Sequence, residues 1–457
     1  MAIVYEPCRR DELAQTLPLL DAQAPHRALA WRDGSAIDVA QFVAHVELVA
    51  AQLPHAPAAV NLCEDRYAFL VAFCAIVRRG QANLLPPSRA PQAVAEVMAA
   101  HPGCYALGEQ AMQPAPPGYR RLPTLVADIA PVVGDVPTIS AGQVAVIGYT
   151  SGSTGTPRAH AKTWRSLHAS TAGTLAMLRA AAGGAFTVVA TVPPQHIYGI
   201  EMSVLLPLLG GVGVHSGRPF FPADVAATLA EVPAPRVLVT TPVHLRALVE
   251  SGIALPPLAA VLSATAVLPP ELAHIAEARF GAPVLEVFGS TETCAFAGRR
   301  LTADEHWTLF PGVHLHPQPD GTAIDAPQLD TPAILADLVT LHDDGARFRL
   351  CGRHADLLEI AGKRASLGDL TRRLLAVPGV TDGVVFQLDE ADAIGVRRIA
   401  ALAVAPQLDE HAILDALREA IDPVFLPRRL RLVDALPRNE TGKLPRAALR
   451  ALLSGRA

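Results

Sequence analysis

The sequence predicts an α/β fold, in which a large N-terminal domain of parallel-type sheets flanked by helices precedes a smaller, mobile C-terminal α/β domain. Short apolar runs alternate with segments of helical length and periodicity, the pattern of parallel sheets covered by helices. Several apolar runs end in small or polar residues, where open α/β sheets place their ligands. At 457 residues the chain is too long for one hydrophobic core, so we expect two or three domains.

The first third of the chain alternates strands with helices. We expect strands at 28–34, 58–62 and 83–87, and helices at about 40–53, 67–79 and 90–100. The second helix should end near Gly80, because glycine is a common helix stop.

The middle of the chain repeats a unit in which an apolar strand runs into a polar loop. The strands are expected at 144–148, 186–192, 236–241, 260–263 and 283–288. Residues 301–350 contain shorter, turn-rich pieces that suggest antiparallel strands. A smaller α/β unit follows, so we expect domains at 1–352 and 353–457 with a hinge at 352–356.

Composition excludes several classes of protein. The net charge of −5 with both signs mixed offers no basic surface for nucleic acid or an anionic membrane. The amino terminus lacks a signal-peptide pattern, and no apolar run reaches membrane-spanning length. The six cysteines show no CxxC pairing, which favours reduced thiols in a cytoplasmic protein over metal ligation.

The most informative stretch is YTSGSTGTPR, residues 149–158, directly after the strand at 144–148. Its glycines and hydroxyl side chains suit a loop whose backbone N–H groups wrap a polyanion. Composition alone would also allow a flexible Gly/Ser linker, although a linker rarely follows a buried strand directly. The phosphate-loop pattern G-x-x-x-x-G-K-[ST] is absent, which excludes a Walker-type site.

This loop resembles the phosphate loop of the adenylate-forming ligases, which include acyl- and aryl-CoA synthetases, aryl-acid AMP ligases, adenylation domains and luciferases. The resemblance implies ATP as the nucleotide. It places Thr150, Ser151, Gly152, Ser153, Thr154 and Gly155 on the phosphates. Arg158 stands where the family usually has lysine, and Lys162 is an alternative phosphate contact that we favour slightly.

A second motif, FGSTE at residues 288–292, resembles the Y-G-x-T-E of the family with phenylalanine in place of tyrosine. A lone glutamate after a strand is usually a solvated loop residue. Beside a phosphate loop, however, Glu292 becomes a good Mg²⁺ ligand, because Mg²⁺ binds through one or two carboxylates plus phosphates. The resemblance assigns the Thr291 hydroxyl to the α-phosphate and Phe288 and Gly289 to the nucleotide site.

A third motif is Asp337, eight residues before Gly345, at the spacing of the family's ribose-binding aspartate. The family's preceding Thr-Gly pair is Leu335-Ala336 here, and a lone aspartate in such a region would otherwise be a turn former. Arg353 follows in a Gly-Arg pair that resembles the family's ribose contact at the hinge.

The fourth motif, PRNETGKLPR at residues 437–446, resembles the family segment that carries the catalytic lysine, here Lys443. Most lysines are simply exposed. Of 38 basic Lys and Arg residues, however, only Lys162, Lys363 and Lys443 are lysines, which suggests that a compact ammonium is required at this position. An ammonium between the acid's carboxylate and the α-phosphate offsets their repulsion and stabilises the transition state.

Other positions depart from the family pattern. Ala264 and Thr265 lie in a Ser-Ala-Thr-Ala segment that replaces the Gly-Gly-Ala beside the adenine. The hinge has Ala355 before Asp356 where the family has two aspartates, so switching to thioester formation is less assured. Gly362 fits the loop that lines the family's thiol tunnel.

The acid pocket is expected to draw on His196, Tyr198, Gly199, Thr241, Ser263 and Gly289. His196 and Tyr198 resemble the His/aromatic pair that fronts the carboxylate in aryl- and acyl-activating members, so His196 joins the catalytic set; the alternative is a solvated loop histidine. The loop at 195–201 lacks the aspartate that, in adenylation domains of the family, pairs with the ammonium group of an amino acid. Amino acids are therefore unlikely substrates unless Glu201 turns inward, because a buried ammonium needs a counter-charge.

These motifs together predict ATP- and Mg²⁺-dependent activation of a carboxylic acid, with an aryl acid such as a hydroxybenzoate favoured. The resulting acyl-AMP would then pass to a phosphopantetheine thiol of an acyl carrier protein or of CoA. The short segment between Glu292 and Asp337 favours a small stand-alone ligase. Two alternatives remain: a medium- or long-chain fatty acyl-CoA or acyl-carrier-protein synthetase, and a catalytically inactive nucleotide-binding regulator.

Overall fold

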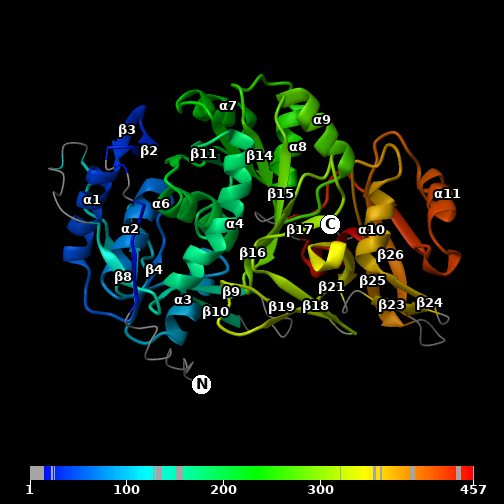
Figure 1. Cartoon of the computed structure of the whole chain (residues 1–457). Helices are drawn as coiled ribbons and strands as arrows, with labels where there is room; N and C mark the ends of the chain where they lie inside the picture. The colour runs from blue at the N-terminus through cyan, green and yellow to red at the C-terminus, as the bar shows by residue number, and fades with distance from the viewer. Residues whose placement is uncertain are drawn as a thin grey trace.

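The computed structural model describes residues 15–21, 24, 26–126, 129, 136–150, 158–319, 321–353, 357–360, 363–391, 397–438 and 444–455. Within these residues the fold is mixed α/β, with a large N-terminal part and a smaller C-terminal part (Figure 1). The predicted fold class is confirmed. None of the described helices is long and apolar enough to cross a membrane.

The first sheet of the N-terminal part has six strands, with β5, β4, β6, β7 and β9 parallel and β10 antiparallel at one edge. Their order is β10 (Arg158–Thr163), β9 (Val144–Thr150), β5 (Ala82–Leu85), β4 (Ala58–Asn61), β6 (Tyr105–Gly108) and β7 (Arg120–Arg121). The sequence predicted β4, β5 and β9 but not β10, which occupies the stretch between the phosphate loop and the next helix.

The second sheet has eleven strands and is parallel from β2 to β15, with antiparallel strands at both edges. Its order is β21 (Asp337–His342), β22 (Arg347–Arg353), β17 (Trp307–Leu309), β16 (Cys294–Arg299), β15 (Val284–Ser290), β14 (Ala260–Ser263), β13 (Arg236–Thr240), β11 (Thr187–Ala190), β12 (Gly213–His215), β2 (Ala28–Arg32) and β3 (Ser35–Asp38). A three-stranded antiparallel sheet, β18 (His314–Gln318), β19 (Gly321–Asp325) and β20 (Ala333–Leu335), accounts for part of the turn-rich segment. A short pair, β1 (Thr16–Pro18) with β8 (Thr138–Ser140), lies apart from these sheets.

Helices cover both large sheets, as the alternating pattern predicted. The N-terminal part contains α1 (Val39–Gln52), α2 (Arg66–Arg78), α3 (Pro91–Ala100), α4 (Trp164–Ala182), α7 (Pro222–Ala230), α8 (Pro242–Glu250) and α9 (Pro270–Phe280). A short helical run, α5 (Ile197–Ile200), a π-helical turn η1 (Glu201–Leu205) and α6 (Leu206–Leu209), follows β11. Helix α4 packs against β16 and η1, and crosses the middle of the view in Figure 1.

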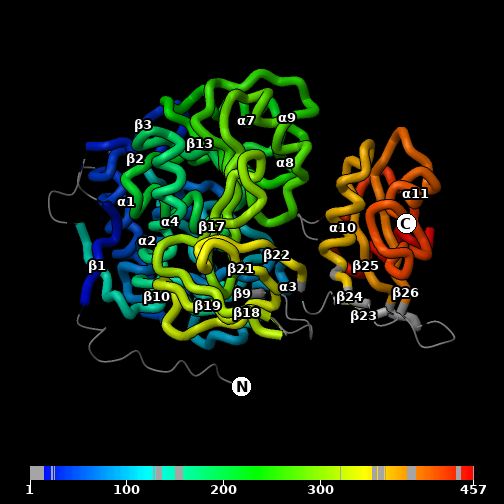
Figure 2. The backbone as a smooth tube through the Cα atoms, turned by 45° about the vertical axis from the view of Figure 1, so that its right-hand side comes forward, coloured from blue at the N-terminus to red at the C-terminus, as the bar shows by residue number. Residues whose placement is uncertain are grey.

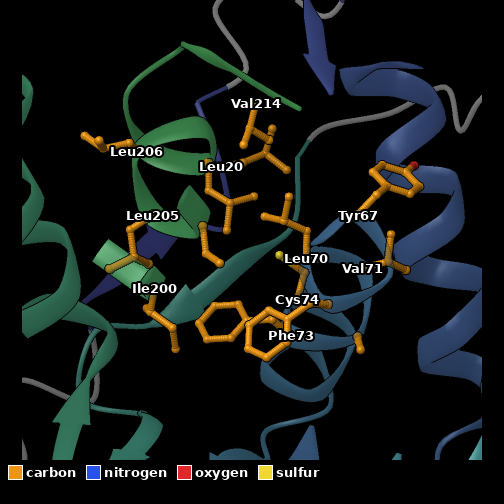
Figure 3. Packing of buried hydrophobic residues seen from close by; sticks show 14 of the residues in the cluster. Leu20, Tyr67, Leu70, Val71, Phe73, Cys74, Ile200, Leu205, Leu206 and Val214 are labelled. Carbon is orange, nitrogen blue, oxygen red and sulfur yellow. The ribbon is translucent and has the colours of Figure 1, made fainter. Parts of the chain in front are cut away.

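The main core draws on both sheets and the helices between them. Figure 3 shows Leu70 and Phe73 of α2 facing Ile200 and Leu205 of the run after β11. Helix α2 is apolar all round, as expected for a helix buried on several sides. This packing fixes the run after β11, which carries candidate pocket residues, against the first sheet's helices.

The C-terminal part has its own hydrophobic core, which includes Leu370, Leu374, Ile399, Ile413 and Leu417. It contains β23 (Leu357–Ile360), β24 (Lys363–Ser366), α10 (Leu367–Leu375), β25 (Asp382–Ala391), β26 (Arg397–Val404), α11 (Glu410–Ala420), β27 (Arg429–Leu432) and α12 (Arg446–Ser454). Figure 2 shows these elements as a separate lobe beside the N-terminal part. The exact boundary at 352/353 stays a prediction.

Candidate active site

The carboxyl ends of the parallel strands bring several predicted residues to one edge of the second sheet. Thr240 of β13 pairs with Ser263 of β14, and Ser263 pairs with Glu286 of β15. Thr241 and Ala264 directly follow β13 and β14, and Phe288 lies in β15 two residues after Glu286, so all three lie at the same edge. This edge is where parallel α/β sheets bind their ligands.

The FGSTE motif forms a tight hairpin between β15 and β16 rather than an open loop. A β-carbon at Gly289 would lie 2.1 Å from the carbonyl oxygen of Cys294, so only glycine fits this close approach. Inside the turn, the Ser290 amide donates to Thr293 Oγ1 at 3.1 Å, and the Thr293 amide donates to Ser290 Oγ at 3.3 Å. The turn that carries Thr291 and Glu292 is therefore held by its own hydrogen bonds.

This turn lies against the first sheet, at the strands on either side of the phosphate loop. A β-carbon at Gly148 of β9 would lie 3.0 Å from Thr291 Cγ2. Glu292 Oε1 lies 3.4 Å from His160 Nε2 of β10, and Lys162 Nζ donates to the Glu292 carbonyl oxygen. The structure thus brings together the second motif and the two strands that flank the first motif.

Glu292 keeps its charge in this position. Burial works to raise the pKa of its carboxyl group, but backbone and Ser290 hydrogen bonds and the charges of His160 and Lys162 outweigh it, so the pKa lies below its usual range. An ionised, partly exposed carboxylate fits Mg²⁺, which needs few protein ligands when phosphates supply others. Among the described residues, no group of three or more His, Cys, Asp and Glu is placed to hold a metal ion.

The basic residues of β10 alternate with small ones in the sequence RAHAKT, so Arg158, His160 and Lys162 lie on one face of the strand. Lys162 is buried, His160 half-buried and Arg158 exposed. Lys162 contacts the backbone of Glu292, and the expectations that Lys162 or Arg158 contacts the phosphates both stay predictions. The period of two in this stretch is the signal that could have revealed β10 and His160.

Glu201 is a second residue whose place the sequence did not settle. Its side chain turns inward and is buried, and its two carboxylate oxygens accept from the Ala295 amide at 3.0 and 3.2 Å. Burial raises the pKa of Glu201 to about 7, although the Ala295 amide, the Lys162 charge and a Ser170 hydrogen bond oppose this.

The expected acid-pocket residues come from the same edge of the second sheet. His196 is the N-cap residue of α5, and Tyr198 donates from its hydroxyl to the carbonyls of Thr240 and Leu262, both at 3.1 Å. Gly199 makes a close turn, since a β-carbon there would lie 1.9 Å from the Pro193 carbonyl oxygen. Thr241 is buried and caps α8 through the His244 amide.

Ser263 stands out in this group because its hydroxyl oxygen is fully buried and has no hydrogen-bond partner. Buried hydroxyls normally find a partner, which makes this oxygen a candidate for contact with a ligand.

Arg66 is a positioning residue that the sequence did not predict. Its guanidinium group is fully buried and donates to the carbonyls of Ala190 at 2.9 Å and Val192 at 3.0 Å, and to Ser203 Oγ. These bonds tie the end of β11 to η1 on either side of His196 and Tyr198. An arginine at the start of an otherwise apolar helix was the available signal.

The expected adenine-side residues lie at the junction of the two lobes and beside an aromatic cluster. Thr265 has a φ of +79°, a strained value for a β-branched residue of the kind found at functional sites. It lines a cavity of about 210 Å³ together with Val243 and Arg246 of the N-terminal part and Arg438 and Leu444 of the C-terminal part.

The ring centroid of Phe288 lies 5.3 Å from that of Phe296 and 5.2 Å from that of Trp307. The phenylalanine that replaces the family's tyrosine thus belongs to an aromatic cluster.

Asp337 and Arg353 are brought together by strand pairing. They face each other in the antiparallel register of β21 and β22, although they are sixteen positions apart in the sequence. Thr322 Oγ1 donates to the Asp337 carbonyl oxygen at 2.7 Å and anchors the start of β21. Two residues assigned separately to the ribose therefore share one end of a hairpin.

Several expected site residues lie outside the described residues. These are the phosphate-loop residues Ser151, Gly152, Ser153, Thr154 and Gly155, the hinge residues Ala355 and Asp356, the tunnel residue Gly362 and the catalytic candidate Lys443. The side chains of Thr150 and Arg353 are likewise not described.

Comparison with known proteins identifies the family. A family model described as AMP-binding enzyme matches residues 22–317. The chain is 29% identical to a 4-coumarate–CoA ligase of Halorhodospira halophila over 334 residues, which cover 70% of this chain and 79% of that protein. It is 31% identical to a 4-coumarate–CoA ligase of Rhodobacter capsulatus over 301 residues, covering 64% of this chain and 73% of that one.

The fold is shared with o-succinylbenzoate coenzyme A synthetase of Bacillus subtilis, solved in complex with AMP. The TM-score is 0.79 at 17% identity, covering 95% of this chain and 98% of that one. The extent of the family match and the identity to the Rhodobacter ligase show that the chain belongs to the AMP-binding enzyme family and is an adenylate-forming ligase.

Proposed function

We propose that this protein activates an aryl acid, such as a hydroxybenzoate, with ATP and Mg²⁺ and then transfers the acyl group to a phosphopantetheine thiol. In the first step a carboxylate oxygen of the acid attacks the α-phosphorus of ATP, and pyrophosphate leaves with the electrons of the broken P–O bond. In the second step a thiolate attacks the acyl carbon of the acyl-AMP, and AMP leaves. The observation that carries the proposal is the meeting of the Thr291–Glu292 turn with β9 and β10, the strands that flank the phosphate loop.

This meeting supports an assignment of roles around the phosphates. Glu292 would hold Mg²⁺, which when bound supplies charge neutralisation on the phosphate oxygens. The Thr291 hydroxyl would donate to the α-phosphate, and residues 150–155 would hold the β- and γ-phosphates through backbone amides and hydroxyls. Arg158, exposed on the face of β10 that carries His160, would add a guanidinium contact.

The nucleoside would lie along the edge of the second sheet. Phe288, Gly289, Ala264 and Thr265 would form the adenine side, and the carboxylate of Asp337 with Arg353 would bind the ribose hydroxyls. The pairing of Asp337 with Arg353 supports this assignment, because one short hairpin end would then present both side chains.

Lys443 would supply the cation that bridges the acid's carboxylate and the α-phosphate. Leu444, the next residue, lines the cavity that Thr265 also lines, which supports a place for this segment beside the nucleotide. We place the domain boundary at 352/353. Ala355 and Asp356 would form the hinge about which the small domain moves between the two steps, and Gly362 would line the thiol tunnel.

The acid would lie between the run after β11 and the ends of β13–β15, with His196 at its carboxylate. Tyr198, Thr241 and Ser263 would form the walls. The unpartnered Ser263 hydroxyl offers a hydrogen bond to a polar substituent of the acid. The 4-coumarate–CoA ligases named above act on an aromatic acid, which favours the same class here.

Glu201 turns inward, but its carboxylate is already engaged, so we do not propose amino acids as substrates. Both oxygens of its carboxylate already accept from the Ala295 amide, and the Lys162 charge lies near it. A substrate ammonium would have to compete with that lysine for the same carboxylate.

ATP–pyrophosphate exchange over a panel of benzoates, hydroxybenzoates, cinnamates and fatty acids tests the acid. We expect hydroxybenzoates to give the fastest exchange, and exchange with fatty acids alone would favour the fatty-acid alternative and contradict the aryl assignment. Transfer to CoA and to a phosphopantetheine-loaded carrier protein, assayed separately, then identifies the thiol.

Lys443→Ala tests the catalytic cation. Loss of one such electrostatic group typically lowers the rate by about 10²–10³-fold, with little change expected in ATP affinity. Lys363→Ala is the matched control, since it removes another of the three lysines. Near-normal exchange in Lys443→Ala would exclude Lys443 as the cation, and no acyl-AMP from the wild type in a single turnover would favour the inactive regulator.

A further inference from the structure

Lys162 is a buried ammonium in a chain that uses lysine only three times. Its side chain is 4% exposed, and its Nζ donates to the carbonyl oxygen of Glu292. A buried charge is costly unless it is hydrogen-bonded and compensated by an opposite charge. One carbonyl oxygen does not compensate an ammonium group, so a carboxylate nearby is needed.

Glu201 supplies that carboxylate from a different element, and its side chain is ionised above its pKa of about 7. It is 5% exposed in η1, and its charge and that of Lys162 act on each other. The other groups that face this pair are Ser170 of α4, Cys294 of β16, Tyr198 of α5 and, beyond Lys162, His160 and Glu292. Among these residues, Lys162 is therefore the cation whose charge acts on Glu201.

The two side chains hold opposite ends of one short segment. Lys162 binds the carbonyl oxygen of Glu292, and Glu201 binds the amide of Ala295, three residues later. Between them Cys294 adopts a φ of +58°, which is unfavourable for a residue with a side chain. Such a conformation persists only where the surroundings impose it.

We propose that Lys162 and Glu201 are positioning residues for the metal site, which clamp the segment from Glu292 to Ala295 and keep the Glu292 carboxylate beside β10. The proposal rests on the proposed function, because it takes Glu292 as the ligand of the nucleotide's Mg²⁺. Neither residue touches the nucleotide. Lys162 thus acts on the phosphates only through the glutamate that it places.

The test measures metal and nucleotide binding separately in Lys162→Met, which keeps the length of the side chain and removes its charge. Mn²⁺ serves as the probe, and its binding to the enzyme–ATP complex is followed by electron paramagnetic resonance. We expect Mn²⁺ affinity to fall by about 10- to 100-fold, the usual effect of losing a group that orients a metal ligand. ATP affinity measured in EDTA should match that of the wild type, since on this proposal the lysine does not touch ATP.

Lys162→Arg should recover part of the Mn²⁺ affinity, because a guanidinium can still donate to the Glu292 carbonyl. The double variant Lys162→Met/Glu201→Leu removes both charges and leaves no uncompensated one. It should be more stable than Lys162→Met alone yet keep the weak Mn²⁺ binding. Recovery of both stability and Mn²⁺ affinity would mean that the pair is only structural.

Glu286→Gln is the matched control. Glu286 is also a buried glutamate of the second sheet, paired with Arg299 at 2.6 Å, but it does not contact the Glu292 segment. This variant should bind Mn²⁺ as the wild type does.

A large loss of ATP affinity in EDTA for Lys162→Met would assign the lysine to the phosphates and overturn the proposal. Unchanged Mn²⁺ affinity would overturn it as well. Failure of the wild type to form acyl-AMP from any acid would instead remove the proposed activity and leave the comparison of metal affinities intact.

Discussion

Gly148 of β9 and Thr291 of the β15–β16 turn are in contact across the two large sheets: a β-carbon at Gly148 would lie 3.0 Å from Thr291 Cγ2. One residue separates Gly148 from Thr150, where the phosphate loop begins. The absence of a side chain at Gly148 therefore sets how closely the turn approaches that loop.

Substituting Gly148 should separate these two parts of the site. Valine would push against Thr291, and overpacking of this kind costs about 1–3 kcal/mol in stability. Because a 1 Å misplacement can cost about 10²-fold in rate, we expect pyrophosphate exchange to fall by 10- to 100-fold. The control is Ala161→Val, an exposed position on neighbouring β10. Equal activity in the two variants would mean that this contact does not place Thr291.

The Glu292 carboxylate should govern the Mg²⁺ requirement. Glu292→Gln keeps the shape of the side chain but removes its charge. In the wild type the low pKa of the Glu292 carboxyl group keeps that group ionised. We expect the exchange rate to fall on the order of 10²-fold and the Mg²⁺ concentration for half-maximal rate to rise. Glu271→Gln, exposed on α9, is the control and should titrate like the wild type. An unchanged Mg²⁺ titration for Glu292→Gln would remove Glu292 from the metal site.

Stability should depend on pH through Glu201. Its pKa is about 7 in the folded protein against a usual 4.5, so between these values the folded state keeps a proton that the unfolded state has lost. The free energy of unfolding must therefore decrease as pH rises from 4.5 to 7. The glutamine of Glu201→Gln cannot ionise. The melting temperature of this variant should therefore increase relative to that of the wild type as pH rises from 5 to 8.

Thermal melts of Glu201→Gln, the wild type and Glu250→Gln over this pH range check the prediction. Glu250 is exposed, so its variant should follow the wild type at every pH. A constant difference between Glu201→Gln and the wild type would show that Glu201 does not titrate in this window.

Arg66 should be important for stability. Arg66→Met leaves the carbonyls of Ala190 and Val192 buried without their donor, and each such group costs about 1–3 kcal/mol. We expect a loss of at least about 2 kcal/mol in urea unfolding. Since these bonds hold the run that begins at His196, the KM for the acid should rise more than the KM for ATP. Arg246→Met, half-buried in the inter-lobe cavity, is the comparison.

The sequence was sufficient for the α/β class, for most N-terminal strands and helices, and for the polar strand ends. Apolar runs such as 236–240 match their strands because local periodicity and burial agree there. The family motifs also led to the residues that meet across the sheets, although strand register, which pairs Asp337 with Arg353, is not visible in spacing alone.

What the sequence could not predict depends on contacts between distant segments. A glutamate after a tyrosine and two small or apolar residues carries no local sign that it turns inward. Glu201 does so because Ala295 and Lys162, each more than thirty residues away, offer an amide and a charge. Strand β10 was not predicted, because an alternation of basic residues and alanine over only six positions is a weak signal.

The aromatic cluster around Phe288 has an optical consequence. Of the three tryptophans in the chain, Trp164 is fully buried in the main core, whereas Trp307 lies with its ring centroid 5.2 Å from that of Phe288 and 4.1 Å beneath the guanidinium of Arg299. On the proposed assignment, an adenine stacked on Phe288 would stand one ring away from an indole. The intrinsic fluorescence of the native enzyme would then report nucleotide occupancy directly, without a label.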